Sequence, residues 1–172
     1  MQTQPDTARV WDWLAEIPDP EIPAISLTDL GIIRDVAWQD DTLVVTVTPT
    51  YSGCPATGVI NLDIETALRS HGIEKLELKR KLSPPWTTDW ITDAGREKLR
   101  AYGIAPPVDG TAADGQLAGR ISRLAGTSNL VIACPRCRSN ATERVSQFGS
   151  TPCKASYRCT DCLEPFDYFK CI

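Results

Sequence analysis

The chain has 172 residues, of which 42% are hydrophobic and 23% charged, the composition of an ordinary globular protein that can bury a core. Its net charge of −4 excludes a general electrostatic attraction to nucleic acid or to anionic membranes. It contains no apolar run near the ~20 residues that cross a bilayer and no basic, apolar leader, so we expect a cytoplasmic protein with reduced thiols.

The first 80 residues predict an α+β domain. Apolar residues at helical spacing predict a helix within residues 5–18, with Asp6 or Thr7 as a candidate cap. Two strands follow around a polar turn at residues 39–42, and a third strand lies within residues 73–82. Between the second and third strands a second helix is predicted over residues 54–72, with Gly72 as its candidate C-terminal stop. Because this second helix connects two strands of one sheet, a right-handed crossover is expected.

The next segment is rich in proline and contains a predicted short helix that extends to Tyr102, with Thr92 as its candidate cap. A stretch rich in Pro, Gly and Ala follows, and this composition is typical of a linker. We therefore predict a first domain over residues 1–104, a linker over residues 105–127 and a second domain over residues 128–172.

Four cysteines in two pairs, Cys134-x-x-Cys137 and Cys159-x-x-Cys162, dominate the second domain. Two such pairs suit a tetrahedral zinc site, in which each pair forms a tight knuckle around the metal. The segment has too little apolar content to fold unaided, so metal binding would supply the missing free energy. The predicted fold class is therefore an α+β domain with a small mixed sheet and two or three helices, followed by a zinc-ribbon-like β domain. An iron–sulfur cluster is the alternative to zinc.

Cys153 and Cys171 accompany this quartet. They are either small buried residues or additional metal ligands, and their spacing leaves both interpretations open. From Cys134 onward the chain carries six Lys or Arg against four Asp or Glu, a balance of +2 without a basic stripe. A protein contact is therefore favoured over nucleic acid for this domain.

Cys54 lies apart from the other six cysteines, between a predicted strand and the second predicted helix. A helix N-terminus lowers the pKa of a nearby thiol and favours the thiolate. The sole histidine, His71, lies 17 residues further on, at the other end of that helix, which argues against a protease-type Cys–His pair. Cys54 is therefore either a reactive or metal-contacting group or an inert packing residue.

The stretches DPEIPAISLTDLGII and VTPTYSGCPATGVI resemble the iron–sulfur assembly family that includes the bacterial SufT proteins. That family has a D-P-E turn, a D-L-G strand start and a T-x-T…C-P motif. The matching positions here are Asp19, Pro20, Glu21, Asp29, Leu30, Gly31, Thr48, Thr50, Cys54 and Pro55. The segment SPPWTTDWITDAGREKLRAYGIAPP and the ending CLEPFDYFKC are similar to its PaaD (PaaJ) branch, which is encoded with a phenylacetyl-CoA oxygenase (epoxidase).

This resemblance implies an accessory or maturation protein of the oxygenase in phenylacetate degradation, which aids assembly of its iron or iron–sulfur centres. It implies Cys54 as the contact for iron or a cluster, with Asp19 and Glu21 as candidate oxygen donors for metal transfer. The implied partners are the oxygenase and reductase components, with no membrane partner, and homodimer formation stays open. No turnover chemistry of its own is implied.

Two other classes of function stay open. In the first, the chain is a zinc-ribbon adaptor that binds the oxygenase without delivering metal. In the second, it is a thiol-redox enzyme that uses Cys54.

Overall fold

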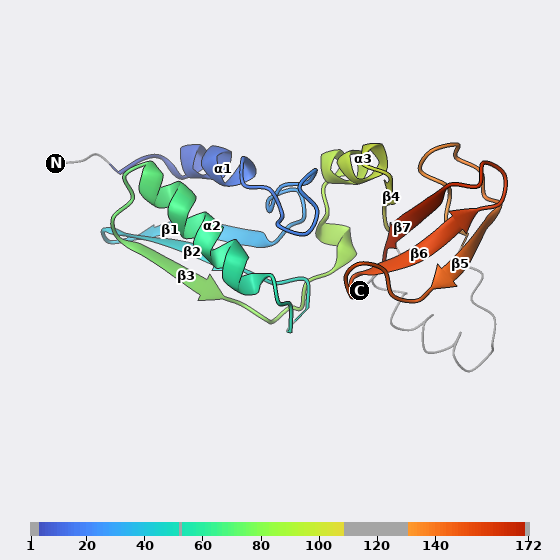
Figure 1. The fold of residues 1–172 in the computed structure, drawn as a ribbon. Coiled ribbons are helices and arrows are strands. Elements are labelled where there is room, and N and C mark those ends of the chain that lie inside the picture. The colour runs from blue at the N-terminus through green and yellow to red at the C-terminus, as the bar shows by residue number, and fades with distance from the viewer. Residues whose placement is uncertain (1–3, 52, 109–130, 171–172) are drawn as a thin grey trace. The chain divides into compact units, whose positions relative to one another are not determined.

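The computed structural model describes residues 4–51, 53–108 and 131–170, which form helices and two small sheets (Figure 1). They divide into two compact units, Met1–Trp86 and Thr87–Ile172. The first unit combines helices with a mixed sheet, and the second contains a four-stranded sheet. The predicted fold class is confirmed. No helix in the described part of the chain is long and apolar enough to cross a membrane.

The sheet of the first unit has the order β1-β2-β3. Strand β1 (Ile33–Gln39) pairs antiparallel with β2 (Thr42–Val47) through a two-residue turn, in which Asp40 adopts a left-handed conformation with φ 54°. Strand β3 (Leu76–Arg80) then pairs parallel with β2. The parallel pairing requires the crossover that the sequence predicts, and α2 (Thr57–Ser70) supplies it.

Helix α1 (Thr7–Ala15) contacts α2 and β1. The Asp6 carboxylate accepts a hydrogen bond from the Ala8 amide at 3.3 Å, so the predicted cap is confirmed. Helix α2 buries one stripe of side chains, Ile60, Ile64 and Leu68. Helix α2 contacts α1, and Val59 and Leu62 on its other side are exposed.

Gly72 ends α2 through its left-handed conformation, with φ 86°. The Gly72 amide donates to the Arg69 carbonyl at 2.9 Å, and the Ile73 amide donates to the Leu68 carbonyl at 3.1 Å. This pair of bonds is the Schellman arrangement, which satisfies carbonyls that a helix end would otherwise leave unpaired. The predicted stop at Gly72 is confirmed.

The loop between α1 and β1 is packed as tightly as a core element. Its five fully buried apolar side chains are Ile22, Ile25, Leu27, Leu30 and Ile32. Trp86, which is 3% exposed, donates its indole N–H to the Leu30 carbonyl at 2.8 Å. The last residue of the first unit therefore fixes this loop.

The second unit begins with a 3₁₀ turn, η1 (Thr88–Trp90), and with α3 (Asp93–Ala101). The Thr92 hydroxyl accepts from the Gly95 amide at 2.9 Å and caps α3. The sheet has the order β4-β7-β6-β5. Its strands are β4 (Ile104–Ala105), β5 (Thr142–Ser146), β6 (Lys154–Cys159) and β7 (Pro165–Phe169).

The division after Trp86 falls earlier in the chain than the predicted boundary at residues 104 and 105. The physical reason is β4, which pairs parallel with β7 and so belongs to the second sheet. Helix α3 contacts β4 and goes with it. Most of the predicted linker, from residue 109 onward, lies outside the described residues, and separate folding of the two units stays a prediction.

Replacing Trp86 with Phe is expected to lower the free energy of unfolding of the first unit by about 1–2 kcal/mol, because the buried Leu30 carbonyl loses its donor. Urea denaturation of the full chain measures this change. Trp38→Phe is the matched control, since the Trp38 indole donates to the Pro5 carbonyl at 3.0 Å from a half-buried position. A loss at Trp86 no larger than the loss at Trp38 would contradict this account.

Candidate metal centre and the Cys54 turn

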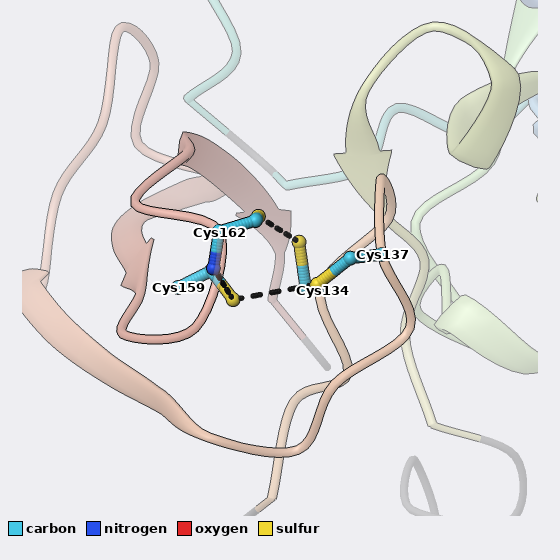
Figure 2. Close-up of side chains that lie close together, drawn as sticks. All are labelled: Cys134, Cys137, Cys159 and Cys162. Atoms are coloured by element: carbon cyan, nitrogen blue, oxygen red, sulfur yellow. Dashed lines mark hydrogen bonds between the residues drawn. The ribbon is translucent and has the colours of Figure 1, made fainter.

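The sulfur atoms of Cys134, Cys137, Cys159 and Cys162 all lie within 4.8 Å of one another. The closest approaches join the two knuckles, with 3.7 Å between Cys134 and Cys162 and 3.6 Å between Cys137 and Cys159 (Figure 2). A tetrahedral zinc site with Zn–S near ~2.3 Å requires sulfurs about 3.8 Å apart. The quartet therefore has the donor atoms and the spacing of a metal-binding cluster, and it suits a metal such as zinc.

The two knuckles are the same backbone turn built twice. The Cys134 amide donates to the Ser139 carbonyl at 2.9 Å, and the Cys159 amide donates to the Glu164 carbonyl at 2.9 Å. In both knuckles, donor and acceptor are therefore five residues apart. This repetition places the two cysteine pairs in equivalent positions on either side of the site.

The residue after the second cysteine of each knuckle is left-handed. Arg138 and Leu163 each have a φ of 63°. A side chain on such a residue brings Cβ close to the backbone at a cost of roughly 1–2 kcal/mol, and glycine avoids this cost. Leu163 is also 60% exposed, so burial does not offset its strain. The spacing of the cysteines could not reveal this feature, because it concerns a backbone angle.

Hydrogen bonding and crowding move the thiol pKa values in opposite directions. The Cys162 amide donates to the Cys159 sulfur at 3.5 Å and lowers the pKa of Cys159 to about 7. For Cys137, the Ser139 amide lowers the pKa, but desolvation and the neighbouring thiols outweigh it and raise the pKa to about 12. Four thiolates at this spacing therefore need a cation among them.

Two polar contacts join the knuckles at the surface. The Arg136 guanidinium pairs with the Glu164 carboxylate, and this hydrogen bond raises the pKa of Arg136. The Ser139 hydroxyl donates to the Asp161 carboxylate. The Arg136–Glu164 pair is largely exposed, so it orients the knuckles and adds little stability.

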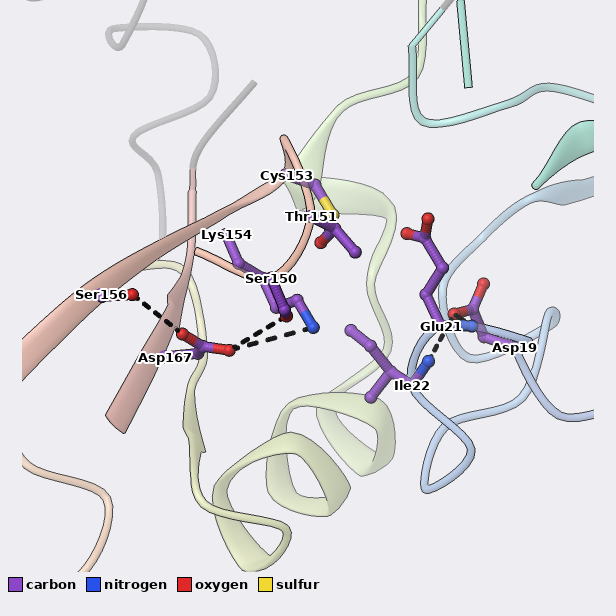
Figure 3. Close-up of polar contacts among 9 residues, drawn as sticks. All are labelled: Asp19, Glu21, Ile22, Ser150, Thr151, Cys153, Lys154, Ser156 and Asp167. Carbon is purple, nitrogen blue, oxygen red and sulfur yellow. Dashed lines mark hydrogen bonds and ion pairs between the residues drawn. The ribbon is translucent and has the colours of Figure 1, made fainter. Parts of the chain in front are cut away.

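Cys153 does not join the quartet. It is buried, and its sulfur lies 3.0 Å from the Thr151 hydroxyl oxygen (Figure 3). Its backbone carbonyl accepts from the Lys170 amide at 2.9 Å. Cys171, the other predicted additional ligand, lies outside the described residues.

A buried lysine lies on the same sheet. The Lys154 side chain is 6% exposed, and its ammonium lies 3.9 Å from the Asp167 carboxylate (Figure 3). The hydroxyls of Ser150 and Ser156 lie 3.4 and 3.5 Å from the same carboxylate. A Cβ on Gly149 would approach Asp167 Oδ1 to 2.9 Å, so glycine is needed for this close approach. Asp167 therefore fixes the turn that precedes β6.

Cys54 lies just before α2 and not in its first turn, which corrects the predicted helix start. The helix begins at Thr57, because the Cys54 carbonyl accepts from the Thr57 amide at 3.2 Å and from its hydroxyl at 2.9 Å in a preceding turn. The first turn of α2 has no side-chain cap and no acidic residue. The half-buried Cys54 thus stays next to the positive end of an uncompensated helix dipole.

Asp19 shapes the turn that contains it. This buried carboxylate accepts through Oδ1 from the amides of Glu21 at 2.9 Å and Ile22 at 2.8 Å (Figure 3). Glu21 is half-buried. In the described part of the chain, the cysteine quartet is the one group of three or more His, Cys, Asp or Glu ligand atoms close enough to share a metal. The structure does not gather Asp19, Glu21 and Cys54 into a second such group.

Two family profiles match this chain, one within each of its two units. The family profile described as "Iron-sulfur cluster assembly protein" matches residues 7–75. The profile described as "PaaD zinc beta ribbon domain" matches residues 120–170. The first range contains Cys54, and the second contains the quartet.

Individual relatives resemble either the whole chain or its first part. A "Putative 1,2-phenylacetyl-CoA epoxidase" component of Escherichia coli (strain K12) is 45% identical over 168 residues, which cover 98% of this chain and 94% of that protein. An "Fe-S protein maturation auxiliary factor" of Porphyromonas gingivalis is 32% identical over 101 residues, covering 58% of this chain and 92% of that protein. The solved DUF59 domain from Bacillus anthracis has a TM-score of 0.50 and 25% identity, covering 54% of this chain and 89% of that structure.

Replacing Cys159 with Ser is expected to abolish stoichiometric metal binding, because it removes one of four gathered sulfurs. Metal content per chain after dialysis measures this loss. Cys153→Ser is the matched control and should keep one metal per chain, since Cys153 lies outside the quartet. Equal losses in both variants would mean that Cys153 is a ligand.

Replacing Leu163 with Gly is expected to raise the free energy of unfolding of the metal-loaded second unit by about 1 kcal/mol, because glycine relieves the left-handed backbone. Denaturant titration measures this gain. Leu82→Gly is the control, since Leu82 is also an exposed leucine but has no positive φ, and it should give no gain. Stability unchanged by Leu163→Gly would show that the site tolerates leucine without strain.

Proposed function

The chain belongs to the PaaD family of phenylacetyl-CoA epoxidase components, and we propose that within such an epoxidase system it aids the assembly of iron or iron–sulfur centres. Its homology to the epoxidase component and to iron–sulfur maturation factors supports an accessory role. The observation that carries the proposal is the union, in one chain, of an assembly-family domain with a four-cysteine ribbon.

In this proposal the quartet holds zinc as a resident structural metal, with an iron–sulfur cluster as the alternative. Zinc bound by four thiolates has no open coordination position, so its role is to hold the ribbon together. Two sulfurs, those of Cys134 and Cys159, are buried, which favours a permanently held metal over an exchanged one. The reduced cysteines fit a cytoplasmic protein, and we propose that location.

Iron, or a cluster, is the cargo and Cys54 is its proposed contact. Cys54 is not one of the quartet's ligands, and its half-buried side chain lies beside an uncapped helix N-terminus, a position that the resident metal does not occupy. Asp19 and Glu21 are the proposed oxygen donors, on a turn that the Asp19 carboxylate itself organises. Because the three residues do not form a ready-made site in the described structure, delivery would require the turn to move or a partner to complete the ligand set.

The proposed partners are the oxygenase component and the reductase component of the epoxidase, and the chain can act as a monomer or as a homodimer. The second candidate function is an adaptor that binds the oxygenase without carrying metal. It is favoured by the same observation that Asp19, Glu21 and Cys54 are not gathered. A thiol-redox role for Cys54 is less well supported, since no cysteine of the described residues pairs with it.

Cells that carry only the Cys54→Ser variant are expected to build an oxygenase with a small fraction of its normal iron content and activity, because serine is a poor iron ligand. The ribbon should keep its own metal, since Cys54 is not among its ligands. Iron content of the purified oxygenase and metal content of the variant are the two measurements. Cys153→Ser is the control and should leave oxygenase loading intact.

A fully iron-loaded, active oxygenase in Cys54→Ser cells would reject metal transfer through this thiol. Deletion of the whole chain would then separate the remaining cases. An oxygenase that is lost in the deletion strain but normal with Cys54→Ser identifies the adaptor.

A further inference from the structure

The first three turns of the outward face of α2 carry a stripe of uncharged residues, and Arg69 lies on the same face beyond its end. We call the residues Gly58, Val59, Leu62 and Thr66 the α2 stripe. With 3.6 residues per turn, they lie on the side of the helix opposite the buried Ile60, Ile64 and Leu68. Val59 is 48% exposed and Leu62 is 62% exposed. A surface helix normally places charged and polar side chains on this side.

Nothing described inside the first unit accounts for this stripe. A Cβ on Gly58 would meet no atom within 4 Å, and Gly58 has no positive φ. Neither packing nor backbone geometry therefore requires glycine, which is a poorer helix former than alanine. The exposed Val59 and Leu62 likewise gain little from contact with their own unit. Within the described residues of the first unit, no packing contact therefore explains why glycine, valine and leucine occupy these positions.

Two carboxylates border the stripe. At 100° per residue, Asp63 follows Val59 around one side of the helix and Glu65 lies beside Gly58 on the other side. Neither forms an ion pair of 4.0 Å or less with any Lys or Arg among the residues described. The cation of this face, Arg69, lies beyond the end of the stripe, where its guanidinium donates to the Glu74 carbonyl at 3.1 Å. The border of the stripe itself is therefore acidic, which favours a partner of opposite charge.

We propose that the α2 stripe is a docking surface for a partner protein whose apolar patch is bordered by Lys and Arg. Apolar contact with Val59 and Leu62 would supply affinity, while Asp63 and Glu65 would select the basic partner and speed its association. The bare surface at Gly58 lets the partner approach the helix backbone. Leu62 is five residues beyond Thr57, about 7.5 Å along the axis at ~1.5 Å per residue, so the partner would lie next to the Cys54 turn. This inference rests on the proposed function, in which that partner is the iron-receiving oxygenase component.

The test measures binding of the full-length chain to the purified oxygenase component by calorimetry. The double variant Val59→Gln with Leu62→Gln removes apolar area and keeps helix-forming side chains, and binding should weaken at least ~10-fold. Leu82→Gln is the matched control, an exposed leucine of the same unit outside the stripe, and it should bind as the wild type does. Asp63→Asn with Glu65→Gln should slow association and flatten its dependence on salt.

Gly58→Ala gives a readout that damaged folding could not produce. Alanine should raise the thermal midpoint of the first unit, because it favours the helix, and should weaken binding, because it occupies the space left for the partner. Unchanged binding by this variant and by the double variant would overturn the inference, as would a wild-type chain that does not bind the oxygenase component.

The docking surface and the metal role can fail separately. Normal binding by the stripe variants, together with defective oxygenase loading by Cys54→Ser, would overturn the docking surface and leave the proposed function standing. Weakened binding by the stripe variants, together with normal loading by Cys54→Ser, would support the docking surface and reject metal transfer.

Discussion

Four sulfur atoms held within 4.8 Å of one another are the constraint on which the second unit depends. Two of them, from Cys134 and Cys159, are also members of its small hydrophobic core, together with Ala105, Ile132, Ala155, Phe166 and Tyr168. The metal site and the core are thus one structure. A cation that neutralises the sulfurs at the same time closes the apolar cluster, which explains how so short a segment can hold a four-stranded sheet.

The features that could be predicted from the sequence are those with local causes. The C-x-x-C spacing, the Thr92 cap and the glycine that ends α2 each depend on a few neighbouring residues, and the structure confirms these elements. The boundary between the two units could not be predicted in this way, because it depends on a long-range strand pairing. Two residues of β4 add to β7, some sixty positions away, and no local composition indicates this.

In the candidate site, too, the features with local causes could be predicted and those that depend on the folded backbone could not. Gathering of the quartet was predictable, whereas the start of α2 after Cys54 depended on a turn closed by the Thr57 hydroxyl. Asp19 stands out in the sequence as a carboxylate in a motif of the assembly family, but in the structure it accepts two amides of its own turn. Hydrogen-bond geometry of this kind follows from the folded chain, since a carboxylate that binds metal and one that shapes a turn have the same side chain.

The buried Lys154 has a consequence for chemical reactivity. An amine reacts with an acylating reagent only when the reagent can reach it. The Lys154 nitrogen is shielded by burial and faces the Asp167 carboxylate, whereas Lys75 and Lys79 have widely exposed side chains. Acylation followed by mass spectrometry would therefore modify these lysines of the first unit early. Lys154 would be labelled only in molecules whose ribbon sheet has opened, so its labelling rate measures how often that sheet opens.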